Sequence, residues 1–355
     1  MSNKRLFLRL ILPIALVFSA NLPADTLKLA PDHPDEYVVV KGDTLWDISS
    51  RFLQDPWLWP EIWQINPAIQ NPHLIYPGDI IRLKYVDGKP VLTVQRGDEH
   101  AGLPTVKLSP GARYSSLETA IPTIPVDAIK QFLLHPRIVS DGEVEASPYI
   151  VATADDHVIS GSGDKVYVRG LDPDTDQHSY NIVRKGKVYR DPENPKHILG
   201  IEAIDVGDAD LTATGDPSTL VIRKANREVL KGDRLLPPLE EEPDQHFTPR
   251  APQDRVEGQI ISVLDGVSRI GRLQTVVINR GKADGLERGH VLAVYRTGDE
   301  VRDTVGDVKR ADRIVKLPNE RAGTLMIVRL FDNISYALVM EATRDLRILD
   351  TVENP

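Results

Sequence analysis

The stretch from Tyr37 to Leu83 constrains the fold more than any other part of the chain, because strand, turn and helix signals follow one another closely within it. Its β-branched opening, Tyr37 to Val40, predicts a short strand, and Lys41-Gly42-Asp43 supplies the turn residues that end it. Thr44 and Asp47 then stand three residues apart in T-L-W-D. This spacing predicts a capping box, in which the Thr44 hydroxyl accepts the Asp47 amide and the Asp47 carboxylate accepts the Thr44 amide. The buried face of the helix that follows would contain Leu45, Ile48 and Phe52.

A second helix is expected to begin at either Pro56 or Pro60, since proline is favoured in a first helical turn and disfavoured in a helix interior. We favour Pro60, with Asn66-Pro67 ending the helix. Tyr76-Pro77-Gly78-Asp79 has proline and glycine at the two central positions of a type II turn. Ile80 to Leu83 would form a second strand, so the whole stretch reads β-α-α-β.

The order of strand, G-D-T-L, two short helices, N-P and a closing I-Y-P-G-D-x-I resembles the lysin motif (LysM) family. The resemblance implies a two-stranded antiparallel sheet packed against two helices, and binding of glycans that contain N-acetylglucosamine, in bacteria usually peptidoglycan. It also implies a shallow groove between the loop after the first strand and the loop before the second. The groove residues would be Gly42, Asp43, Thr44 and Leu45 on one side, and Asn71, Pro72, Leu74, Ile75 and Tyr76 on the other.

Each of these residues also has a purely structural interpretation. Asp43 and Thr44 could serve only as helix caps, Leu74 or Ile75 could belong to the core, and Tyr76 could serve mainly the turn. The four tryptophans of the chain all lie in the same stretch, where they could fill the core or stack on sugar rings. We predict a core role for Trp46 and Trp63 and leave both roles open for Trp57 and Trp59.

The first 24 residues have the pattern of a secretory signal peptide. Lys4 and Arg5 form a basic start, Leu10 to Ala20 is an apolar run, and Ala20 and Ala24 are candidate residues for the cleavage site. The apolar run is shorter than the roughly 20 residues that a membrane-spanning helix needs. We therefore expect export to the periplasm. The chain has no cysteine, which excludes disulfides and lipidation on a cysteine.

The charge balance narrows the choice of partners. The formal net charge is −9, so the chain has no basic field that would collect DNA or RNA by counterion release. Its 355 residues are 41% hydrophobic and suffice for two or three domains with cores of their own. We therefore expect a multidomain α+β protein that does not bind nucleic acid.

The rest of the chain is expected to be mainly β. After a LysM domain at 35–85, prolines and glycines predict an extended connector at 86–125 with some local pairing. A short helix at Asp127 to Leu134 would open a mainly β domain at 126–238, and an acidic, proline-rich linker at 239–254 would lead to a second mainly β domain at 255–355. The clearest predicted strands are 149–152, 165–168, 181–183, 198–204, 220–222, 258–262, 275–279, 291–295, 323–330 and 335–340.

The two β blocks resemble each other, which we interpret as an internal duplication, the alternative being a chance match of strand and turn patterns. The matched segments are 165–170 with 275–281, 180–186 with 292–298, 199–204 with 322–327, and 224–233 with 341–350. A duplication would give either tandem β domains or two halves of one barrel-like body. Exposed strand edges of such bodies would be docking sites for a partner strand.

The sequence shows no pattern of catalytic or metal-binding residues. The histidines form no H-x-x-x-H pair, and Gly161-Ser162-Gly163-Asp164 lacks the spacing of a nucleophile elbow. Asp172, Asp174 and Asp176 suggest a calcium loop, but Gln177 and Val183 stand where a glycine and a glutamate are required. We therefore expect neither a metal nor another cofactor and predict a protein that is not an enzyme, although a pair of glycosidase carboxylates stays an open alternative.

The layout as a whole is similar to that of the secretin-associated proteins of type IV pili (TsaP-like proteins). The shared features are a signal peptide, one N-terminal LysM motif with D-P-W-L-W-P-E-I-W at 55–63, and a long β-rich tail. This resemblance implies that the LysM motif holds peptidoglycan while the tail associates with the outer-membrane secretin. The alternatives are a cell-wall hydrolase that uses the LysM domain for targeting, and a wall-binding scaffold of an unrelated envelope complex.

Overall fold

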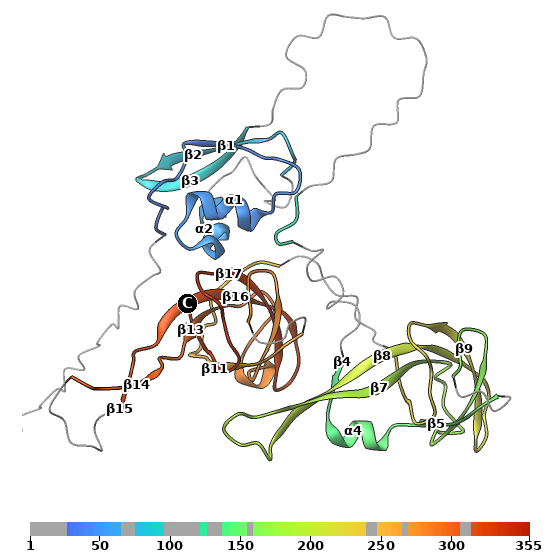
Figure 1. The fold of residues 1–355 in the computed structure, drawn as a ribbon. Helices are drawn as coiled ribbons and strands as arrows, with labels where there is room; N and C mark the ends of the chain where they lie inside the picture. The colour runs from blue at the N-terminus through green and yellow to red at the C-terminus, as the bar shows by residue number, and fades with distance from the viewer. Residues whose placement is uncertain are drawn as a thin grey trace, which may run out of the picture.

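A computed structural model describes residues 27–64, 75–95, 121–125, 137–154, 159–238, 247–264, 269–305 and 314–355. The chain is 10% helical and 47% strand, which confirms a mainly β region after a small α+β unit. Figure 1 shows this N-terminal unit in blue, a middle β body in green and yellow, and a C-terminal β barrel in orange and red. The expected signal peptide and the expected helix at Asp127 to Leu134 lie outside the described residues.

The N-terminal unit contains the predicted elements in the predicted order, together with one more strand. Its elements are β1 (Glu36–Val38), α1 (Leu45–Phe52), the 3-10 helix η1 (Pro56–Leu58), α2 (Trp59–Gln64), β2 (Ile80–Val86) and β3 (Lys89–Gln95). The antiparallel sheet runs β1-β2-β3, and β3 pairs with β2 along its whole length, from Lys89 opposite Val86 to Gln95 opposite Ile80. The sheet therefore has three strands among the described residues, where the resemblance implied two.

Thr44 caps α1, but only half of the predicted capping box forms. The Thr44 hydroxyl accepts the Asp47 amide at 3.1 Å, as expected. The Asp47 carboxylate does not accept a hydrogen bond from the Thr44 amide. Instead, it accepts one from the Thr44 hydroxyl, at 2.7 Å. The aspartate side chain is shorter than that of the usual glutamate, so its carboxylate contacts the Thr44 hydroxyl and not the Thr44 amide. The predicted buried stripe of Leu45, Ile48 and Phe52 is confirmed.

The second helical segment uses both of the candidate prolines. Pro56 opens η1, and α2 begins at Trp59, so Pro60 occupies its first turn and the preferred start is wrong by one residue. The predicted type II turn is confirmed. Gly78 has a φ of +93°, which a glycine adopts without strain, and the Asp79 amide donates to the Tyr76 carbonyl at 3.1 Å.

The middle β body is one antiparallel sheet that closes on itself. Its seven strands run β4-β8-β7-β10-β5-β6-β9, and β8 also pairs with β9. This pairing closes a ring of β5, β6, β9, β8, β7 and β10, to which β4 is added at β8. The bounds are β4 (Arg137–Val139), β5 (Tyr149–Thr153), β6 (Lys165–Arg169), β7 (Ser179–Arg190), β8 (Ile198–Ala213), β9 (Ser218–Ala225) and β10 (Arg234–Leu236).

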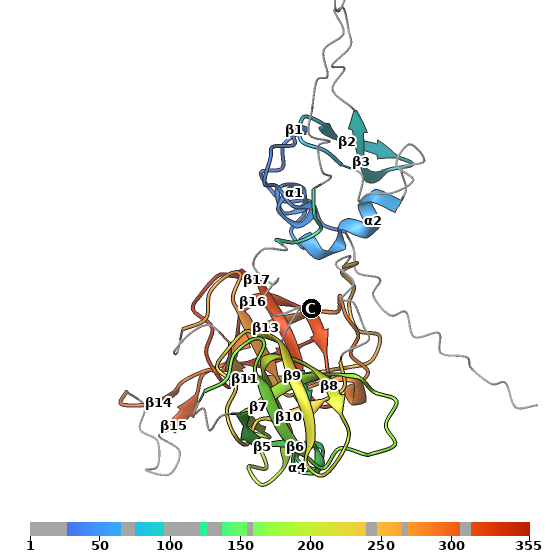
Figure 2. The ribbon, with the colours of Figure 1, turned by 90° about the vertical axis from the view of Figure 1, so that its right-hand side faces the viewer.

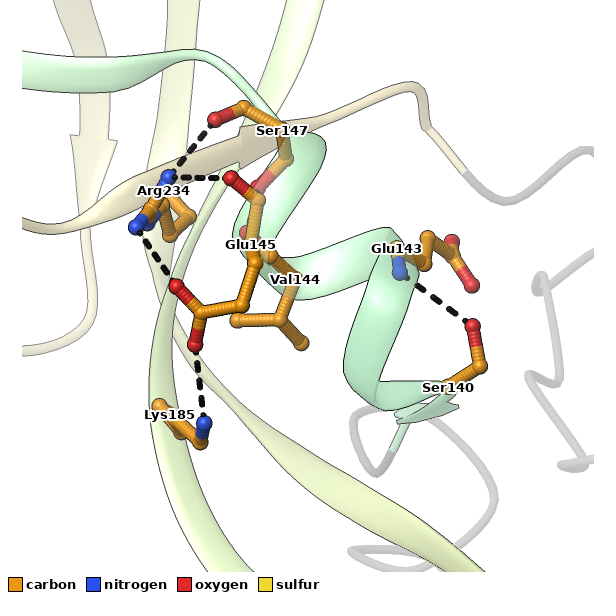
Figure 3. A network of polar contacts seen from close by, with 7 residues as sticks. All are labelled: Ser140, Glu143, Val144, Glu145, Ser147, Lys185 and Arg234. Carbon is orange, nitrogen blue, oxygen red and sulfur yellow. Dashed lines mark hydrogen bonds and ion pairs between the residues drawn. The ribbon is translucent and has the colours of Figure 1, made fainter.

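A short helix, α4 (Asp141–Ala146), is fastened to this ring by one glutamate (Figure 3). Glu145 accepts from Lys185 of β7 at 2.9 Å through one oxygen and from Arg234 of β10 at 3.4 Å through the other. Arg234 also donates to the Ser147 carbonyl at 2.9 Å, and the Ser140 hydroxyl caps the helix by accepting the Glu143 amide at 3.2 Å. The helix is thereby held against two neighbouring strands.

The C-terminal body is a closed barrel of strands β11-β12-β17-β16-β13-β18. The bounds are β11 (Glu257–Val263), β12 (Thr275–Ile278), β13 (Val291–Arg296), β16 (Glu320–Leu330), β17 (Ser335–Ala342) and β18 (Thr351–Glu353). A separate hairpin of β14 (Glu300–Arg302) and β15 (Ile314–Lys316) projects from it (Figure 1). Leu292 and Val339 are among the buried side chains that fill the barrel.

The two β bodies have the same strand order. Around the ring, β5-β6-β9-β8-β7-β10 of the middle body corresponds to β11-β12-β17-β16-β13-β18 of the barrel. Equivalent glycines, Gly207 and Gly323, face the carbonyls of Lys224 and Glu341, which agrees with the predicted match of 224–233 with 341–350. The predicted match of 199–204 with 322–327 has the wrong register, because Gly207 and not Gly200 corresponds to Gly323.

The N-terminal unit lies against the outside of the barrel in both views (Figures 1 and 2). One hydrophobic cluster runs from its helices to barrel side chains that point away from the barrel interior, including Val277, Met326 and Leu338, all of them buried. Two ion pairs flank this contact, Asp47 with Arg272 and Asp55 with Arg321, the latter at 3.6 Å. The tryptophan-rich stretch is thus part of a contact within the chain.

In the part of the chain that the structure describes, no helix is both long enough and apolar enough to cross a lipid bilayer.

Candidate functional site

The residues of the predicted groove lie where α1 begins and directly before β2. On the first side, Gly42 is exposed, Asp43 is half-buried, and Thr44 and Leu45 are buried. On the second side, Ile75 is buried and Tyr76 is half-buried. The other three predicted groove residues, Asn71, Pro72 and Leu74, lie outside the described residues.

The Asp43 side chain stabilises the conformation of the loop before α1. One of its carboxylate oxygens accepts the Val40 amide at 2.9 Å and the Tyr37 hydroxyl at 3.0 Å. Burial raises the pKa of Tyr37, and the hydrogen bond to Asp43 raises it further. The Arg51 guanidinium lies 4.4 Å from the centre of the Tyr37 ring. Asp43 therefore has at least a structural role, as one of its two interpretations predicted.

The second side of the groove is held by the turn before β2. The Asp79 carboxylate accepts the Tyr76 amide at 3.0 Å, which fixes the backbone next to Ile75. The Ile75 side chain is completely buried in the core of the unit. What Ile75 presents to the groove is its carbonyl oxygen, a hydrogen-bond acceptor.

A segment from further along the chain, Ile121 to Pro125, lies between the two sides. The Leu45 amide donates to the Pro122 carbonyl at 3.0 Å, and the Trp46 amide donates to the Thr123 carbonyl at 3.1 Å. On the opposite side, the Ile121 amide donates to the Ile75 carbonyl at 2.8 Å. Figures 1 and 2 show the segment as a short green stretch beside α1.

These bonds account for the first amides of α1. A helix leaves its first amides without partners inside the helix, so they must find acceptors elsewhere. The Asp47 amide uses the Thr44 hydroxyl, while the Leu45 and Trp46 amides use Pro122 and Thr123. The groove therefore offers two backbone donors on one side and one backbone acceptor on the other, a set that suits an amide group.

The contacts of 121–125 differ from the expected extended connector, because this segment packs into the LysM unit. The pattern I-P-T-I-P held a usable signal, because prolines favour an extended backbone while Ile121 and Ile124 supply apolar side chains. Both isoleucines are buried, at 5% and 0% exposure. What the pattern could not show is which surface would cover them.

All four tryptophans are core residues. The predicted core role is confirmed for Trp46 and Trp63, with exposures of 2% and 1%, and it extends to Trp57 and Trp59, at 5% and 1%. A sugar ring cannot stack on an indole face that other side chains already cover. Recognition in this groove would depend on the backbone and on small apolar surfaces.

The described residues contain no group of three or more histidine, cysteine, aspartate or glutamate side chains that could hold a metal ion. The acidic turn at Asp172 to Asp176 forms local hydrogen bonds, with the Asp174 amide donating to the Asp172 carboxylate at 3.0 Å.

Comparison with known proteins identifies the N-terminal unit. The model of the LysM domain family matches residues 37–84. An uncharacterized protein of Bacillus subtilis (strain 168), YqbP, is 37% identical over 60 residues, which cover 14% of this chain and 27% of that protein. The similarity thus spans only about a quarter of that relative. Residues 37–84 are a LysM domain, a domain that binds peptidoglycan and other N-acetylglucosamine glycans, and a large mainly β region follows it.

Proposed function

We propose that this protein is an exported, non-catalytic peptidoglycan-binding protein whose β bodies hold an envelope assembly against the cell wall. The LysM match over residues 37–84 carries the proposal. The groove supports it with main-chain groups of Leu45, Trp46 and Ile75 that can bind the acetamido group of N-acetylglucosamine. An acetamido group has one N–H donor and one carbonyl acceptor, as a peptide group does.

Cosedimentation with insoluble peptidoglycan tests the binding step. The mature full-length chain should pellet with purified sacculi, and a soluble N-acetylglucosamine hexamer should release it in a concentration-dependent way. A glucose hexamer, which lacks acetamido groups, is the matched competitor and should leave the pellet unchanged. Failure of the chain to pellet under any ionic condition would refute the proposed function.

Export to the periplasm is the part of the proposal that depends on residues 1–24. The basic start and the apolar run of this segment support cleavage after Ala20 or Ala24. Cell fractionation followed by sequencing of the N-terminus of the mature protein tests this. An intact Met1 on protein in the cytoplasm would contradict it.

The absence of catalysis is also a proposal, and a peptidoglycan gel tests it. The alternative is a wall hydrolase that the LysM domain brings to its substrate. Incubation of the purified chain in a gel that contains peptidoglycan should produce no cleared zone, with lysozyme as the positive control. Clearing by the chain would support the hydrolase.

The layout resemblance supports the type IV pilus secretin as the partner, and an unrelated envelope complex is the alternative. Crosslinking in intact cells and mass spectrometry of the captured proteins distinguish the two. Crosslinks from the β bodies to a secretin would support the first, and crosslinks to other envelope proteins would support the second.

We further infer that the two β bodies are copies produced by an internal duplication. Their shared strand order supports this, as do two pairs of equivalent residues, Gly207 with Gly323 and Asp233 with Asp350. Each aspartate is buried and accepts the amide three residues before it, from Leu230 in the middle body and from Arg347 in the barrel. In the described residues, the barrel packs against the LysM domain through Val277, Met326 and Leu338.

A further inference from the structure

The LysM groove in this structure is filled by the chain itself. Ile121, Pro122 and Thr123 use the Ile75 carbonyl, the Leu45 amide and the Trp46 amide, which line the groove. Thr123 and Ile124 are buried there, at 4% and 0% exposure. We propose that Ile121–Pro125 is an intramolecular competitor that must leave the groove before glycan can enter. This inference rests on the proposed function.

The chemistry of the contact explains why the two occupants would compete. The segment supplies two carbonyl acceptors and one N–H donor to the groove, all from its main chain. An N-acetylglucosamine unit supplies the same kinds of group from its acetamido substituent. The two ligands therefore satisfy the same backbone partners, and these partners cannot bind both at once.

The contacts favour the state in which the segment occupies the groove when glycan is absent, and they still allow glycan to replace the segment. Residues 96–120 join the segment covalently to β3, so its binding in the groove is intramolecular and independent of protein concentration. Its described contacts include three backbone hydrogen bonds and the side chains of Ile121 and Ile124. If the open groove is a minor state of about 10% or less, apparent glycan affinity is roughly tenfold or more below that of the open groove.

Ile124→Asp in the full-length chain is the variant that empties the groove. It places a charge where a side chain is 0% exposed, so the segment should leave. Ile314→Asp is the matched control: it makes the same change at an isoleucine that is 64% exposed, in the hairpin of β14 and β15. Ile124→Asp should bind the N-acetylglucosamine hexamer roughly tenfold or more tightly than the unchanged chain, and Ile314→Asp should bind as the unchanged chain does.

A thiol provides a second readout that does not require a buried charge. Because the chain has no cysteine, Thr123→Cys introduces a single thiol at a buried position of similar size. Its reaction with a maleimide should be slow in the free protein and should accelerate several-fold when the hexamer saturates the groove. A thiol that reacts at the rate of an unfolded control before any glycan is added would overturn the proposal.

The outcomes separate this inference from the proposed function. Two results would overturn the competition and leave the proposed function intact. One is that glycan binds while the thiol stays protected, and the other is that glycan binds Ile124→Asp and the unchanged chain equally tightly. Binding by Ile124→Asp that is roughly tenfold or more tighter than binding by the unchanged chain supports the competition. Failure of both proteins to bind the hexamer and sacculi refutes the proposed function, and the inference falls with it.

Discussion

The Trp46 amide donates a 3.1 Å hydrogen bond to the carbonyl of Thr123, a residue far along the chain from it. This bond and its neighbours make Ile121–Pro125 part of the LysM unit, although the family match ends at residue 84. The folded unit is therefore longer than the family match.

Thr44→Ala should weaken glycan binding and lower the stability of the LysM unit by about 1 kcal/mol, because the α1 cap is lost next to the groove. Ser140→Ala removes an equivalent cap from α4, with the same hydroxyl-to-amide bond, and should cost a similar amount without affecting binding. Thermal melting and titration with the N-acetylglucosamine hexamer measure the two effects. Equal binding by both variants would show that the cap does not shape the groove.

Trp59→Ala should destabilise the LysM unit by about 3–5 kcal/mol, because it removes a large side chain that is 1% exposed. Tyr85→Ala, at an aromatic side chain that is 62% exposed, should change stability by about 0.5 kcal/mol or less. Urea unfolding followed by far-ultraviolet circular dichroism compares them. A stable Trp59→Ala variant that has lost only glycan binding would instead assign Trp59 to the sugar.

Gly207→Ala and Gly323→Ala should both destabilise their own β body by about 1–3 kcal/mol. In each case a Cβ atom would collide with the facing carbonyl, that of Lys224 or of Glu341. Gly142→Ala, in α4 with open space around its Cβ position, should be neutral or stabilising by up to about 1 kcal/mol. Thermal unfolding of the three variants provides the test, and a silent change at only one of the two glycines would argue against their equivalence.

Asp350 should make the barrel more stable as the pH falls. Burial raises the pKa of Asp350 above its ordinary value of 3.8 in the folded state. A carboxyl with a raised folded pKa contributes stability below the unfolded pKa and loses it as pH rises through the folded pKa. Asp350→Asn removes this loss of stability at high pH, so the unfolding midpoint of the variant should exceed that of the unchanged chain at pH 7. The difference between the two midpoints should narrow towards about pH 4.

Asp233 is the matched residue for that experiment. It occupies the equivalent position in the middle body but forms a two-pronged ion pair with Arg184, at 2.7 and 2.8 Å. Asp233→Asn should therefore lower stability at pH 7 by about 1.5–3 kcal/mol, the usual worth of a charged hydrogen bond. A gain in stability from Asp233→Asn, or a loss from Asp350→Asn, would contradict the assigned roles.

Local signals were sufficient to predict the first strand, the helices and the turn of the LysM unit. The strand, the Thr44 cap and the Pro77-Gly78 turn depend on neighbouring residues, and local chemistry determines them. Most strands of the β bodies could be placed in the same way, although β7 and β8 extend well beyond the predicted 181–183 and 198–204. The short strands β4, β10, β14, β15 and β18 were not predicted. Pairing partners decide where a strand ends, and a single sequence does not reveal them.

The parts that sequence reasoning missed all depend on distant contacts. β3 was placed in the connector because only its pairing with β2 distinguishes it from an isolated β-like fragment. Two other contacts were missed for the same reason: the packing of Ile124 in the groove, and the ion pair between Asp55 and Arg321. In both contacts the residues are far apart in the sequence, and no local pattern indicates that they meet. The Asp47 carboxylate was assigned to the Thr44 amide, yet it binds the Thr44 hydroxyl and Arg272.

Ring closure in both β bodies has a consequence for resistance to aggregation. In the described residues, each of the six ring strands of a body has a neighbour on both sides, so neither ring exposes a row of unpaired backbone groups. Such rows are templates on which unfolded or crowded chains aggregate. A polypeptide that cannot use disulfide crosslinks thus gains protection from topology, which resists aggregation whatever the redox state of its surroundings.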